Sequence, residues 1–203
     1  MRKVKYILVI AFLIIMSGKL DPVDSSASNH YNEGSASEEE NIFYNVANSD
    51  EEFATDEWTY DPTVIDEARI ERKAEAYAKE TGKDVNEVKK SLLESAEKNR
   101  ALYLAAMDAG VTVTEEEVTD SINEVKEVTH SDEEAEKSLT ALLAGYKITE
   151  EEYWEKTRPQ YRAILIINKY IKNQMEEKKN EGATNGDQEL VEEISNEALK
   201  NYE

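Results

Sequence analysis

The sequence predicts an all-α protein, a compact bundle of about five to six helices that includes one long helix. Two observations support this prediction. Apolar residues recur at three- and four-residue steps after residue 63, and one phrase occurs twice, as AGVTVTEEEV at 109–118 and AGYKITEEEY at 144–153. In each copy a Gly (Gly110, Gly145) ends one helix in the left-handed conformation. A Thr, with a Glu three residues later, then begins the next helix as a capping box.

Residues 1–27 are typical of a secretory signal peptide. A basic start precedes the apolar run 7–16, which is shorter than the roughly 20 residues of a membrane-spanning helix. We expect export, with cleavage after Ala27, or a weak membrane tether if the signal is retained. Lys19 stands where a lipobox would carry its Cys, so a lipid anchor is excluded.

Residues 28–61 form an acidic, polar segment without a sustained period. Two interpretations stay open: a solvated linker, or an irregular N-terminal arm whose aromatic residues dock onto the helical domain. These aromatic residues are Phe43, Tyr44, Phe53, Trp58 and Tyr60.

The helical domain is expected at 62–178, followed at 179–203 by a polar break and a C-terminal helix that packs on the domain. Asp61-Pro62 precedes the first helix, Thr81-Gly82 ends it, and Asp84 with Glu87 begins the second. The glutamates of the repeated phrase lie in first turns, where they offset the helix dipole, so we read them as helix starts. Pro159 is expected to bend the longest helix. The predicted helices are 63–80, 85–109, 115–129, 132–144, 150–178 and 188–202.

Composition excludes several functional classes. Lys+Arg 24 against Asp+Glu 45 gives a net charge of -21, which argues against nucleic acid or anionic lipid as the main ligand. The chain has no Cys, and its two histidines, His30 and His130, are too far apart in sequence to suggest a metal site. No catalytic motif is present. We therefore expect no catalytic residue, metal or cofactor, and no enzymatic activity.

Residues 100–172 resemble the SurA N-terminal chaperone domain, which also occurs in PrsA-like foldases and is related to the trigger-factor peptide-binding region. The resemblance is carried by LYLAAMDAG, VTVTEEEV, SINEVKE, SLTALLAGYKITEEEYWEK and YRAILIINKYI. It implies an all-α, SurA-like fold that binds unfolded polypeptides. Two features depart from the family: residues 40–62 lack its Val-Asn-Gly strand, and no parvulin domain follows the long helix. Prolyl isomerase activity is therefore not expected.

The leading hypothesis is an exported chaperone-like domain that holds unfolded or newly translocated polypeptides in an apolar groove. Trp154 is the foremost groove candidate, because it follows Tyr153 in the helix and both side chains are not expected to point inward. Each candidate has burial in the core as its alternative. The full set is Tyr103, Met107, Tyr146, Tyr153, Trp154 and Tyr161.

The alternative function is a cell-surface or spore-associated structural or regulatory protein with one dedicated partner. Lys- and Ile-rich composition and the near-lipobox favour a Gram-positive bacterium as the source. Paired helices with exposed apolar faces are also compatible with a homodimer.

Overall fold

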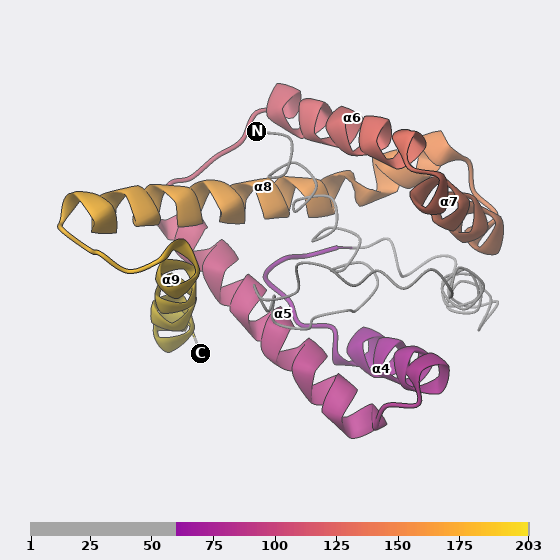
Figure 1. Cartoon of the computed structure of the whole chain (residues 1–203), viewed down its shortest axis with the longest axis horizontal. Coiled ribbons are helices and arrows are strands. Elements are labelled where there is room, and N and C mark those ends of the chain that lie inside the picture. Colours follow the sequence, from indigo (N-terminus) through magenta and orange to yellow (C-terminus); the bar gives the residue numbers. More distant parts are fainter. Residues whose placement is uncertain (1–59, 203) are drawn as a thin grey trace.

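The computed structural model describes residues 60–202. The predicted signal peptide (1–27) and nearly all of the acidic segment (28–61) lie outside the described residues. Within 60–202 the chain forms six helices and no strand, which confirms the all-α prediction (Figure 1). The helices are α4 (Glu67–Thr81), α5 (Val85–Asp108), α6 (Glu115–Ser131), α7 (Glu133–Tyr146), α8 (Glu150–Asn180) and α9 (Asp187–Tyr202).

The capping signals place most helix starts correctly. Both repeats form a complete capping box, at α6 and at α8. At α6 the backbone N–H of Glu117 donates to the Thr114 hydroxyl (3.1 Å), and the Glu117 carboxylate accepts from the Thr114 N–H (2.7 Å). The first helix begins at Glu67 rather than at 63, because Asp66 caps it by accepting from the Arg69 N–H (2.9 Å). The residues after Asp61 form a turn instead.

The two copies of the repeated phrase end their first helix differently. Gly110 has φ 70°, as predicted, and the next N–H, of Val111, donates to the carbonyl of Ala106 (2.9 Å). In the second copy α7 continues through Gly145 to Tyr146, and Lys147 takes the left-handed conformation with φ 54°. The prediction that Gly145 ends this helix is therefore wrong.

An apolar contact explains the shift of the helix end. With Lys147 in the left-handed position, the N–H of Ile148 donates to the carbonyl of Leu143 (3.2 Å). This is the pair of positions whose side chains usually touch in such a motif, and here both pack against the same apolar cluster. An end at Gly145 would put Tyr146 and Ala141 in these positions instead.

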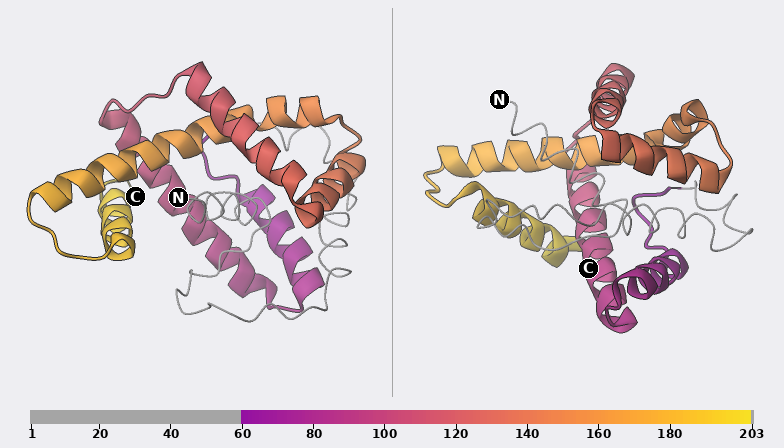
Figure 2. Two further views of the ribbon diagram at one scale, coloured as in Figure 1. Left: turned by 45° about the horizontal axis from the view of Figure 1, so that its top comes forward. Right: turned by 45° about the vertical axis from the view of Figure 1, so that its right-hand side comes forward.

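Helix α8 is central to the packing and continues through Pro159. Helices α4 and α5 form an antiparallel hairpin, and α5 packs against α8 (Figures 1 and 2). Helices α6 and α7 pack together, with α6 along the first part of α8, while α9 lies against α5 and α8. None of the helices in 60–202 combines the length and hydropathy that membrane-spanning segments require.

Three apolar clusters hold these elements, and the smallest, Ala106, Val111 and Ile166, packs the end of α5 against α8. The first joins α6, α7 and the start of α8, and its buried members are Val118, Ile122, Val125, Leu139, Tyr153, Trp154 and Tyr161. The second joins α5, α8 and α9, and its buried members are Ala101, Leu102, Ala105, Ile167, Ile194 and Ala198. The C-terminal helix therefore packs on the domain through its apolar stripe.

Candidate functional site

Three of the six sequence-predicted groove residues are core residues. Tyr153, Trp154 and Tyr161 expose only 5%, 4% and 2% of their surface. The premise that Tyr153 and Trp154 cannot both point inward is wrong, because their rings meet edge to face, with centroids 4.9 Å apart, inside the cluster shared by α6, α7 and α8. Two helices cover a wider sector of α8 than one helix would, and this sector includes both neighbouring positions.

The other three candidates come from two separate places, because Tyr103 and Met107 lie one turn apart on α5 and Tyr146 lies at the end of α7. Tyr103, on α5, is half-buried and packs against the cluster of α5, α8 and α9. Met107, at the end of α5, is 47% exposed. Tyr146 is half-buried at the end of α7. The structure therefore does not gather the predicted residues into one groove.

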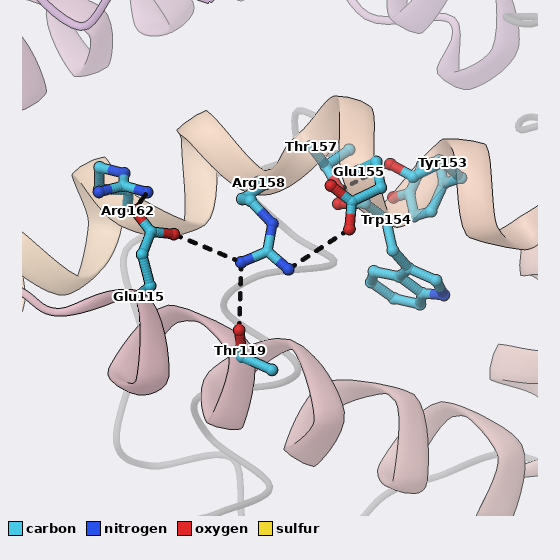
Figure 3. Close-up of polar contacts among 8 residues, drawn as sticks. All are labelled: Glu115, Thr119, Tyr153, Trp154, Glu155, Thr157, Arg158 and Arg162. Carbon is cyan, nitrogen blue, oxygen red and sulfur yellow. Dashed lines mark hydrogen bonds and ion pairs between the residues drawn. The ribbon is translucent and has the colours of Figure 1, made fainter.

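The acidic first turn of α6 is fastened to α8 by two arginines (Figure 3). The Arg158 guanidinium donates to the Thr119 hydroxyl (3.2 Å) and lies 3.7 Å from the Glu115 carboxylate and 3.3 Å from that of Glu155. Arg162 donates to Glu115, and this hydrogen bond lowers the pKa of the Glu115 carboxyl. Besides starting a helix, the triplet therefore positions α6 on α8.

The second triplet is likewise structural. Partial burial raises the pKa of Glu150, but hydrogen bonds from the Trp154 indole (2.8 Å) and from His130 (3.0 Å) hold it below its usual value. His130 also lies 3.6 Å from Glu136, so it links three helices at the surface. Residues 60–202 contain no group of three or more metal-ligating side chains placed to hold an ion.

A groove lies elsewhere, between the segment 60–66, α4, α5 and α8, and we call it the α4–α8 groove. Its volume is about 620 Å³. Apolar side chains from all four walls line it: Ile65, Ile70, Leu92, Ala96, Ile164 and Ile167. The volume lies in the range of about 300–1,000 Å³ that is usual for small-ligand sites, which is room for a few residues of extended chain.

Three side-chain amides stand among these apolar residues. Asn99 comes from α5, and Gln160 and Asn168 come from α8. None of the three forms a hydrogen bond to another residue of the described part of the chain; Gln160 is only 6% exposed, whereas Asn99 and Asn168 are exposed. Each amide carries both donors and an acceptor. The groove thus offers apolar contact together with hydrogen-bonding groups of both kinds.

The groove is also less acidic than the rest of the chain. Arg69, Lys73 and Arg100 line it, against Asp61, Asp66 and Glu67, in a protein of net charge -21. Of these acids, Asp61 accepts from the Thr63 N–H, and Asp66 caps α4. Two of the three carboxylates are thus engaged by backbone N–H groups, which reduces their repulsion of an acidic ligand.

Residues 60–66, which precede α4, are fixed to the groove wall. The Arg100 guanidinium, on α5, donates to the carbonyl oxygens of Thr63 (2.9 Å) and Tyr202 (3.1 Å), so it ties residues 60–66 to α5 and to the end of α9. Burial raises the pKa of the Tyr60 hydroxyl, while nearby Arg69 opposes this shift. Tyr60 therefore forms part of the wall.

Sequence reasoning missed the amides, although a signal for them exists. Gln160 lies four residues before Ile164, and Asn168 lies four residues after it, so all three share one helix face. Asn99 lies seven residues, or about two helix turns, after Leu92, so these two also share one helix face. Only Gln160 is buried, whereas Asn99 and Asn168 are exposed, so Gln160 alone is a buried polar residue, which is the informative kind of exception.

No family model, curated protein or solved structure matches this chain. The groove and the fold therefore carry the functional proposal.

Proposed function

We propose that this protein is an exported, chaperone-like domain that holds short extended segments of unfolded or newly translocated polypeptides in the α4–α8 groove. Prolyl isomerase activity is not part of the proposal. The observation that carries it is the set of three amides, Asn99, Gln160 and Asn168, on an apolar floor.

The chemistry of this surface suits a polypeptide of any sequence. An extended chain presents an N–H and a C=O at every residue, and a side-chain amide can pair with either. Apolar side chains of the client pack on the apolar floor. The free energy gained depends on the apolar area that is buried rather than on the client's sequence. Such contacts favour weak binding of many clients.

The charge of the chain supports a holding role. With a net charge of -21, molecules of this protein repel one another, and a complex with an unfolded client would share that repulsion. The charge does not block the groove, because Arg69, Lys73 and Arg100 line it.

The test measures suppression of aggregation, by light scattering, of two unrelated chemically unfolded proteins in the presence of the full chain. In the test variant, Asn99→Ala with Asn168→Ala, two groove amides are removed. Each net hydrogen bond is worth about 0.5–1.5 kcal/mol, so holding should weaken about tenfold or more.

The matched control is Asn86→Ala with Asn173→Ala. These asparagines lie on the same two helices, are exposed and do not line the groove. The control should hold both clients as well as the parent does. If the parent is helical by circular dichroism but holds neither client, the proposal fails, and a search for one dedicated partner would follow.

A further inference from the structure

The chain enters the described domain through the α4–α8 groove. Tyr60, Asp61, Pro62, Val64 and Ile65 all line it, and Arg100 holds this segment in place through the Thr63 carbonyl (2.9 Å). The described chain therefore begins, at Tyr60, in the wall of the groove.

The sequence just before Tyr60 matches the groove in chemistry. Residues 49–59 read SDEEFATDEWT, with two large aromatic residues, Phe53 and Trp58, and five carboxylates without any cation. The groove offers an apolar floor for the rings, and its wall holds Arg69, Lys73 and Arg100 beside three carboxylates. In a chain of net charge -21, this wall is therefore a comparatively favourable surface for an acidic segment with two aromatic rings.

The distance is short enough for this segment to reach the whole groove. Seven residues of extended chain, from Phe53 to Thr59, span up to about 23 Å. A segment tethered by a short connection has an effective concentration in about the millimolar range at its site. An arm with only weak intrinsic affinity therefore occupies the groove for much of the time.

We infer that residues 49–59 are the resident occupant of the α4–α8 groove, bound within the same chain through Phe53 and Trp58. A client must displace this arm, so the arm sets the threshold of affinity at which clients are held. The occupancy stands on the groove and the sequence, whereas the competition with clients rests on the proposed function.

The first experiment uses Trp58 in the full chain as a reporter. The chain has only two tryptophans, Trp58 and Trp154, so the parent emission minus that of a Trp58→Phe variant isolates Trp58 without disturbing the core. We expect blue-shifted Trp58 emission and protection from acrylamide quenching. Both should be lost in Ala96→Glu, which fills and charges the groove.

The control for this substitution is Asn173→Glu, which adds the same charge to an exposed position of α8 outside the groove. It should leave Trp58 as protected as in the parent. If Trp58 is quenched equally in the parent and in Ala96→Glu, the arm does not occupy the groove, and the inference is overturned.

The second experiment measures client binding by the full chain with Phe53→Ser and Trp58→Ser. Removing the apolar anchors of the arm should raise the apparent affinity for a fluorescent unfolded client about tenfold. High salt, which screens the carboxylates of the arm, should raise it in the parent and much less in the variant.

The two proposals fail in distinguishable ways. If clients are held with equal affinity by the parent and by the Phe53 and Trp58 variant, the arm does not compete and the inference is overturned, while the proposed function stands. If Trp58 is protected through the groove but no client is held by either form, the occupancy stands and the chaperone role is refuted.

Discussion

Truncation of Ile194 tests whether the C-terminal helix belongs to the cooperative core. Ile194 exposes 1% of its surface and packs between α5 and α8, in the cluster that contains Leu102 and Ile167. Burying an aliphatic side chain of this size is worth about 1.5–3 kcal/mol. A cavity term adds to this, so replacement of a buried Ile by Ala typically costs about 2–5 kcal/mol.

We therefore expect Ile194→Ala to lower the free energy of unfolding by about 3 kcal/mol in urea titrations followed by circular dichroism. The m-value should not change, since the same surface is exposed on unfolding. For a domain of this size the midpoint of thermal unfolding should fall by about 10 °C.

The control is Glu192→Ala, on the exposed face of the same helix, which should change stability by less than about 0.5 kcal/mol. A loss below about 1 kcal/mol for Ile194→Ala, or a separate early transition in the parent, would refute the assignment of α9 to the core.

Three further predictions concern helix ends and the aromatic core. Lys147→Gly should stabilise the protein by about 0.5–1 kcal/mol, because Gly takes the left-handed conformation of this position without strain. Gly110→Ala should cost about 1 kcal/mol, because it places a Cβ atom on a residue in that conformation. Urea titration measures both changes. The pKa values of Glu117 and Glu152 are lowered chiefly by the N–H groups of their capping threonines. Their stabilisation is therefore complete above a pH of about 4.5 and is lost as the pH falls through the folded-state pKa. Glu117→Gln with Glu152→Gln, which retains neutral acceptors, should make the acid loss of stability shallower, and an unchanged acid profile would contradict this. Finally, Trp154→Ala should lower the free energy of unfolding by about 3–5 kcal/mol, and any loss of client holding should track unfolding measured in the same samples.

The sequence predicts the helices well because their signals are local. Thr114 and Thr149, each with Glu three residues later, satisfy the first N–H groups of a helix wherever the helix lies in the fold. The three- and four-residue apolar period likewise depends only on helix geometry.

The errors arise where tertiary packing decides the outcome. At the end of α7 the contact of Leu143 and Ile148 with the core outweighs the preference of Gly145 for the left-handed conformation. Tyr153 and Trp154 are both buried because two helices cover them, which no single-helix pattern shows. Sequence alone likewise does not bring together the three helices that line the groove, so its amides could be noticed only as polar exceptions on apolar faces.

The crossing of α5 over α8 has a consequence for how the groove evolves. Several of the buried residues that α5 contributes to its packing against α8 and α9 are small: Ala101, Ala105 and Ala106. A larger residue at one of them would push the α4–α5 hairpin away from α8 and thereby widen the groove. Under the proposed function, the range of polypeptides that fit the groove would then change through substitutions at positions outside the groove.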